Sequence, residues 1–330
     1  MPNGTNGTRS CCICGIQHAL LSNMRILRVL CLAVLFFLLC LVWNPPILAQ
    51  SSPASTAASP PTANEDGAQP GWLWTEGFEG SSDSTGTVTK FASSLGYNFT
   101  RHFGVDLGVP VYFVRTSSST GGSQTNNGIG NAFVDARLML PNSRLNYYST
   151  LTGGAPTGDS AKGLSTGRAT VNWDNRFDHS FDRLTPFADL GLGNTIPDTH
   201  FRQRPFTSLG FVSHFEAGGD FDLLSFLGVG ASGYAIVPEG QQKIFSKFVK
   251  RGGTPTGGGN HNRVFETAAV TTGPASIARD DGFSGWVDIK LKKVATFELG
   301  YSRSLRLDLN TVSFGVIFNL SPLLHGGSRH

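Results

Sequence analysis

Cysteine is absent from the chain after residue 40. All five cysteines precede that point: Cys11, Cys12, Cys14, Cys31 and Cys40. If this N-terminal part is removed as a leader, the mature chain contains no cysteine. A disulfide framework and a thiolate metal site are then both excluded.

Charge is also scarce. Only 15% of the residues are charged and the net charge is +3, whereas soluble enzymes usually carry more charge. The basic residues are scattered rather than gathered in a stripe, so we expect no nucleic-acid partner. The glycine-rich stretch at residues 252–260 lacks the Gly-Lys-Ser/Thr ending of a phosphate-binding loop, which argues against nucleotide binding.

The candidate serine, histidine and carboxylate residues for a hydrolase fall into three small groups: His179-Ser180, Ser213-His214, and Asp280-Asp281 with His261. None has a diagnostic spacing. Neighbouring residues on a strand point to opposite faces, so Ser213 and His214 are poorly placed for a catalytic dyad. The histidines also lack a second ligand at metal spacing. We therefore expect no catalytic residue, no cofactor and no metal. A hydrolase remains the least favoured of the functions considered below, where the sequence is interpreted as a β-barrel.

The N-terminus has the features of a secretory leader. Residues 26–43 are almost wholly apolar, and Ala49 offers a small residue before a cleavage point, so we expect a signal peptide over residues 1–49. Met24 is an alternative start, in which case residues 1–23 are not translated. An uncleaved inner-membrane anchor is the competing interpretation, because the stretch approaches the roughly 18 residues that span a bilayer. The Ser/Pro/Ala-rich residues 50–71 then form a flexible linker.

Glycine and phenylalanine are abundant, at 41 and 24 residues, and the chain after residue 71 alternates apolar and polar residues. The last segment is the clearest, with Ile317 its one exception: Val312, Phe314, Val316, Phe318 and Leu320 share one face, and Thr311, Ser313, Gly315 and Asn319 share the other. This pattern predicts about twelve strands, most of them at or above the roughly 9–11 residues that a tilted strand needs to cross a bilayer. They are 72–80, 87–99, 103–115, 130–141, 146–155, 168–178, 184–195, 207–218, 223–237, 282–291, 294–304 and 309–320.

The gaps between these strands are alternately short and long, as in outer-membrane barrels with short periplasmic turns and longer outer loops. The sequence thus predicts an all-β fold over residues 72–320, a transmembrane antiparallel up-and-down β-barrel of about twelve strands, with ten or fourteen as alternatives. Both barrel ends would be periplasmic, in the outer membrane of a Gram-negative-type bacterium, with a tail at residues 321–330. A soluble sandwich also alternates, but twelve long strands after a leader favour the barrel.

Two short motifs suggest a relationship. Gly128-Ile129-Gly130-Asn131 and Pro156-Thr157-Gly158-Asp159 resemble the outer-membrane β-barrel family named for the MetA pathway of phenol degradation. The resemblance extends over residues 85–320. It departs at Asn131, where the family often has Asp. Members are described as channel-like or transport-related, so the resemblance implies a transporter-like barrel.

Charged residues lie on the face opposite the apolar rows. The predicted lumen-lining residues are Lys90, Asp106, Asp135, Arg137, Arg168, Asp174, Arg176, Asp189, His214, Glu216, Asp288, Lys290 and Glu298. Such charges select and orient a solute in an open channel. Paired across a narrow lumen, they instead hold the interior closed. The sequence leaves both interpretations open.

The loop at residues 238–281 is the predicted determinant of specificity, because loops of this length are usually functional or disordered. Ile244, Phe245, Phe248 and Val249 have helix-compatible spacing, which predicts a segment that folds inward as a constriction. The candidate constriction residues are Lys243, Phe245, Lys247, Phe248, Lys250 and Arg251. A solvated outer loop is the alternative.

These patterns predict an outer-membrane channel for passive passage of a small solute, with hydrophobic or aromatic molecules as candidates. The alternative is a closed structural or adhesive barrel that acts through its extracellular loops. The expected partners are outer-membrane lipid and a small-molecule solute. The oligomeric state is left open.

Overall fold

A computed structural model describes residues 70–116, 124–197, 203–248, 265, 268–291 and 294–320. The predicted signal peptide, nearly all of the predicted linker and the predicted tail lie outside these residues. Among the described residues, no helix is both long and apolar enough to cross a membrane.

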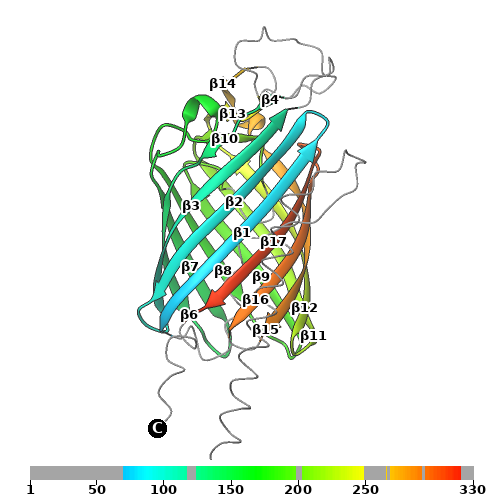
Figure 1. The fold of residues 1–330 in the computed structure, drawn as a ribbon. Helices are drawn as coiled ribbons and strands as arrows, with labels where there is room; N and C mark the ends of the chain where they lie inside the picture. Colours follow the sequence, from blue (N-terminus) through cyan, green and yellow to red (C-terminus); the bar gives the residue numbers. More distant parts are fainter. Residues whose placement is uncertain are drawn as a thin grey trace, which may run out of the picture. The chain divides into compact units, whose positions relative to one another are not determined.

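Twelve long strands form a closed antiparallel barrel (Figure 1). The predicted fold class is confirmed. Each strand pairs with the next long strand along the chain, and β1 pairs with β17 to close the sheet. The strands are β1 (Gly71–Asp83), β2 (Gly86–Asn98), β3 (Phe103–Thr116), β6 (Phe133–Leu140), β7 (Asn146–Gly154), β8 (Thr170–Asp178), β9 (Leu184–Gly193), β11 (Val212–Leu224), β12 (Leu227–Pro238), β15 (Asp280–Leu291), β16 (Ala295–Ser304) and β17 (Leu309–Asn319).

Alternation of side chains explains why these segments form a membrane barrel. On β3, Phe103, Leu107 and Phe113 are exposed on the outer surface, while Tyr112 and Val114 on the opposite face are buried. An outward apolar face suits lipid, and closure of the sheet leaves no unpaired edge. The same division runs through the other long strands.

The two rims of the barrel differ. One rim carries only short connections, such as residues 99–102, 179–183 and 225–226, and both ends of the barrel lie there, whereas all the long connections lie at the other rim. This is the periplasmic rim by the rule for outer-membrane barrels. Aromatic rings mark it: Trp72 contacts Tyr97, and Phe99 contacts both Tyr97 and Phe103. Such rings form the girdle expected at a membrane interface.

Several predicted strand bounds were wrong, including that of 223–237, whose first two residues belong to β11. The predicted strand 207–218 combines β10 (Phe206–Leu209), which is outside the barrel wall, with β11. Gly210 separates them with a φ of 155°, a conformation that favours glycine. The predicted strand 168–178 also began too early, because β8 starts at Thr170. Arg168 therefore precedes the strand and is exposed.

The long connections build a small structure at the outer rim. β10 (Phe206–Leu209), β13 (Gln241–Ser246) and β14 (Val270–Pro274) pair as a separate three-stranded antiparallel sheet, hereafter the cap sheet. The short strands β4 (Gln124–Thr125) and β5 (Gly128–Ile129) pair with β3. Short 3₁₀ turns complete this region: η1 (Ser160–Lys162) and η3 (Ala275–Ile277). In Figure 1 these strands lie at the end of the barrel opposite the periplasmic rim.

Candidate functional site

The barrel lumen is lined by charged side chains that form ion pairs. Lys90 Nζ lies 2.5 Å from the carboxylate of Glu79, and both side chains are almost completely buried. Arg137 binds Asp106 through two nitrogen atoms and also donates to Asn98 Oδ1 at 3.1 Å. Lys290 contacts Asp222 at 2.7 Å. The inner wall is therefore polar, with its charges in contact across neighbouring strands or, for Lys290 and Asp222, across one intervening strand.

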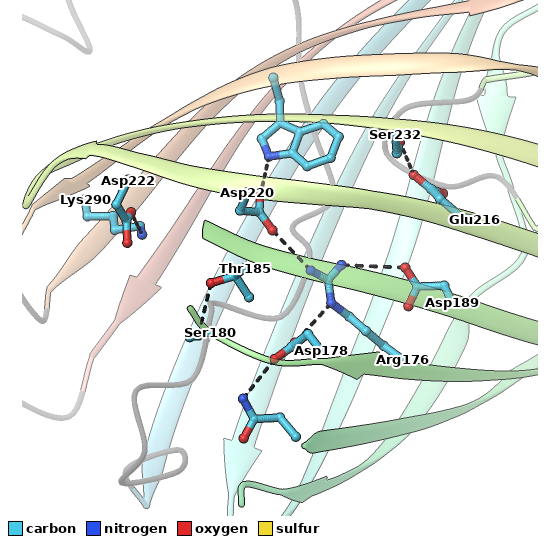
Figure 2. Close-up of polar contacts among 12 residues, drawn as sticks. Arg176, Asp178, Ser180, Thr185, Asp189, Glu216, Asp220, Asp222, Ser232 and Lys290 are labelled. Atoms are coloured by element: carbon cyan, nitrogen blue, oxygen red, sulfur yellow. Dashed lines mark hydrogen bonds and ion pairs between the residues drawn. The ribbon is translucent and has the colours of Figure 1, made fainter. Parts of the chain in front are cut away.

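Arg176 is the centre of the largest ion-pair group. Its nitrogen atoms lie 3.4 Å from Asp178, 3.6 Å from Asp189 and 3.2 Å from Asp220. Figure 2 shows these three carboxylates around the guanidinium group. The guanidinium carbon also lies 3.8 Å from the ring centroid of Phe187, a cation–π contact. One positive charge thus faces three negative charges.

Aromatic and carboxyl side chains lie beside this group on the inner wall. The indole of Trp286 donates to Asp220 at 2.8 Å. Gly230 lies on the neighbouring strand β12. A Cβ atom at this position would overlap the indole, so the glycine provides the space that the Trp286 ring occupies. Asp288 and Glu298 are cross-strand partners on β15 and β16. Their carboxyl groups add to the acidic character of this wall.

His214 and Asp174 meet on the inner wall nearer the outer rim. His214 Nε2 bonds to Asp174 Oδ1, and Asn172 Nδ2 donates to the other oxygen of the same carboxylate. Gly191 lies between Asp174 and His214 in the cross-strand register. A Cβ atom there would overlap both side chains, so glycine is required for their contact.

The cap sheet packs on an apolar cluster. Ile244 and Phe248 from the loop and Phe206 from β10 belong to one buried cluster with inward residues of the barrel wall. The wall residues are Val88, Tyr112, Val114, Val212, Tyr234, Ile236 and Leu309. All of them lie in the outer halves of their strands. The cluster therefore joins the cap sheet to the inside of the outer mouth.

Two buried basic residues fix the cap sheet to the wall. Arg204 lies 3.3 Å from Asp280, and both side chains are only 2% exposed. Asp280 also accepts hydrogen bonds from Ser304 at 2.5 Å and Tyr234 at 3.3 Å. Lys247 donates to the backbone oxygen of Arg204 at 2.9 Å, and its ammonium lies 4.6 Å from the Tyr112 ring centroid.

The outer loops also bind one another. Asn126 donates to the backbone oxygens of Lys162 at 3.0 Å and Lys247 at 3.2 Å. Thr207 donates to the oxygen of Gly163 at 2.7 Å. Gly163 has a φ of 69°, and a Cβ atom there would collide with the backbone of β13. Loops from four connections thus form one covering over the outer mouth.

Comparisons with known proteins concern the fold. No family model matches the sequence, and no curated protein matches it. An outer membrane channel from Pseudomonas putida F1 is 11% identical, with a TM-score of 0.50, covering 79% of this chain and 99% of the other. The KdgM porin is 10% identical with a TM-score of 0.43, covering 74% and 98%. The β domain of the Bordetella autotransporter BrkA is 11% identical with a TM-score of 0.41, covering 76% and 100%.

The chain has the fold of a bacterial outer-membrane β-barrel. The predicted location in the outer membrane is confirmed with it. The proposed relationship to the MetA family is not confirmed, because no family model matches.

The outer-membrane barrel places nearly all predicted lumen residues on its inward face. They are Lys90, Asp106, Asp135, Arg137, Asp174, Arg176, Asp189, His214, Glu216, Asp288, Lys290 and Glu298. Asp135 accepts from Thr152 at 2.5 Å, and Glu216 accepts from Ser232 at 2.5 Å. Arg168 is the exception: it is exposed in the outer loop before β8.

The inward carboxylates missing from the prediction include Glu79, Asp178, Asp220 and Asp222. Their signal was present in the alternation. Asp178 shares the face of Asp174 and Arg176, and Asp220 and Asp222 continue the face of His214 and Glu216. Asp220 and Asp222 were missed because the predicted strand ended at residue 218.

The predicted helical constriction segment is a strand. Phe245, with its neighbour Ile244, lies in β13, whose backbone pairs with β10 and β14 on either side. These cross-strand hydrogen bonds override the helix-compatible spacing. Lys243 is exposed, whereas Lys247 and Phe248 are buried. Lys250, Arg251 and Val249 lie outside the described residues. No cluster of metal-binding side chains occurs in the described parts of the chain.

Proposed function

We propose that this outer-membrane barrel is a channel for passive passage of a small solute. The observation that carries the proposal is the composition of the inner wall. It holds ion pairs, hydroxyl groups and glycines, whereas the outer surface is apolar. A polar interior of this kind suits a water-filled path, along which charged side chains orient a solute. The fold similarity to an outer membrane channel agrees with this role.

The cap sheet is the gate of the proposed channel. It contacts the inside of the outer mouth through the apolar cluster and through Arg204 and Lys247. A solute that enters from outside has to pass these contacts, so the cap sheet has to shift. Conductance would then occur in discrete openings.

Liposome swelling tests the proposal. Proteoliposomes with the refolded chain, residues 50–330, are diluted into iso-osmotic sugars and amino acids of increasing size. A channel for small solutes gives fast swelling with the smallest and none with the largest. Swelling no faster than that of protein-free liposomes, for every solute, would contradict the proposal.

A closed barrel that acts through its extracellular loops is the second candidate. It is favoured by the apolar packing between the cap sheet and the wall and by the buried Arg204–Asp280 pair. This candidate predicts a correctly folded barrel that passes no solute and that still passes none when the cap contacts are removed.

A further inference from the structure

Carboxylates outnumber cationic groups in the described lumen. Every lysine and arginine on the described inner wall has a carboxylate partner: Lys90, Arg137, Arg176 and Lys290. Arg176 alone faces three of them. Asp135, Asp174, Glu216, Asp288 and Glu298 add further acidic groups. A path lined in this way concentrates cations over anions.

Asn172 and His214 supply an observation independent of that charge. They are 4% and 6% exposed, and both contact Asp174. Within the described part of the chain, Asn172 Oδ1 and His214 Nδ1 have no hydrogen-bond partner. An unpaired buried polar atom destabilises the folded barrel, so a ligand that satisfied both atoms would recover this free energy.

The chemistry of these three groups is that of acceptors. The Asp174 carboxylate accepts only, and the free atom of the Asn172 amide is its oxygen. His214 uses Nε2 toward the carboxylate, so in the neutral ring Nδ1 carries a lone pair. A ligand that matches them needs a positive charge and several N–H donors on one atom.

We propose that Asn172, Asp174 and His214 form a binding station for the primary ammonium group of an organic cation that passes through the lumen. The inference rests on the proposed channel function and names the class of solute. The side chain of Asp174 is 38% exposed and is the point of first contact. Asn172 and His214, which both contact this carboxylate, supply the further acceptor atoms.

The neighbouring register positions continue the path. Asp189 and Glu216 are cross-strand partners in the next inward row. Asp189 belongs to the three-carboxylate group around Arg176, and the other two carboxylates of that group, Asp178 and Asp220, lie nearer the periplasmic rim. An ammonium group that leaves the station therefore meets further acceptors in sequence. Conduction requires such successive sites of moderate affinity.

Imidazole ¹⁵N resonances of the folded barrel in detergent test the station directly. The resonances of His214 are those missing from the His214→Gln variant. The chain is titrated with n-butylammonium chloride and, separately, with tetramethylammonium chloride. Both ions carry one positive charge, but only the primary ammonium donates hydrogen bonds. We expect a saturable shift of the His214 resonances with n-butylammonium and a much smaller one with tetramethylammonium.

Two variants complete the binding test. Asp174→Asn removes the charge with little change of shape and should abolish the shift. Asn172→Ala gives the same information if Asp174→Asn does not fold. Glu76→Gln is the matched control, because Glu76 lies on the outer face, where it contacts Trp74 and Ser93. It should leave the shift unchanged. Equal shifts with both ions, no shift, or persistence of the shift in the folded Asp174→Asn barrel would overturn the proposal.

Planar-bilayer recordings separate this inference from the channel function. Under a gradient of potassium chloride, the proposal predicts a reversal potential displaced toward that of potassium and current interruptions by n-butylammonium. Current with chloride preference would overturn the ammonium station and leave the channel intact. A barrel that passes no current yet shows the selective His214 shift would retain the station and refute the channel.

Discussion

His214 reaches the carboxylate of Asp174 across an intervening strand. The two residues are 40 positions apart in sequence and lie on β11 and β8, with β9 between them. Their side chains meet because β9 carries Gly191 at that register position. A missing side chain on one strand thus permits a polar contact between its two neighbours.

Gly191→Ala should break this contact. The added methyl group overlaps His214 and Asp174, so the buried imidazole loses its partner. We expect a loss of about 1–3 kcal/mol in the free energy of unfolding, the usual cost of an unpaired buried polar group. Urea unfolding followed by tryptophan fluorescence measures this change. Gly153→Ala is the control, because no atom lies within 4 Å of its added methyl group. Equal stability of the two variants would contradict the conclusion that the His214–Asp174 contact requires glycine at position 191.

Arg176→Met should increase the preference of the lumen for cations. The substitution leaves Asp178, Asp189 and Asp220 without their guanidinium partner. Reversal potentials in a potassium chloride gradient should move further toward the potassium value. The barrel should also lose about 3–5 kcal/mol of stability, as when one partner of a buried pair is removed.

Arg168→Met is the comparison for that variant. It removes the same charge from an exposed position before β8. We expect little change in either selectivity or stability. An identical shift of the reversal potential in both variants would show that the position in the lumen is unimportant.

Arg204→Met should loosen the cap sheet. It leaves the carboxylate of Asp280 buried without its cationic partner, at a cost of about 3–5 kcal/mol. Trypsin added to intact cells should then cleave faster after Lys243, which is exposed on β13. Asp308→Asn breaks the surface pair with Arg303 and serves as the control. Exposed pairs contribute about 0–1 kcal/mol, so cleavage should stay slow there. Cleavage of Arg204→Met at the parental rate would show that the Arg204–Asp280 pair does not hold the cap sheet in place.

Alternation alone predicted most of the barrel. A residue row such as Phe103, Leu107 and Phe113 can face only lipid or a core, and the spacing of the turns sets the strand count. Inward faces follow from the same parity, which is why Arg137, Arg176 and Glu298 were placed correctly. Local sequence is sufficient here because each strand pairs with its neighbour along the chain.

The remaining features depend on contacts that local sequence does not contain. Gly218 and Gly219 carry no side chain, so they concealed the continuation of β11 to Leu224. The pair of Arg204 and Asp280 joins residues 76 positions apart. β10 pairs with β13, which belongs to a different outer connection. β13 also pairs with β14, which lies in a distant part of the same loop. No periodicity within a segment predicts such partners.

Single-channel conductance is the most direct test of the central claim, that a cap sheet gates a polar lumen. The refolded chain, residues 50–330, is compared in a planar bilayer with a variant in which a short Gly/Ser linker replaces residues 243–260. The replacement removes most of β13 and with it Lys247 and Phe248. We expect discrete current steps in the parent and larger or longer openings in the variant. A folded barrel that passes no current in either form would contradict the channel.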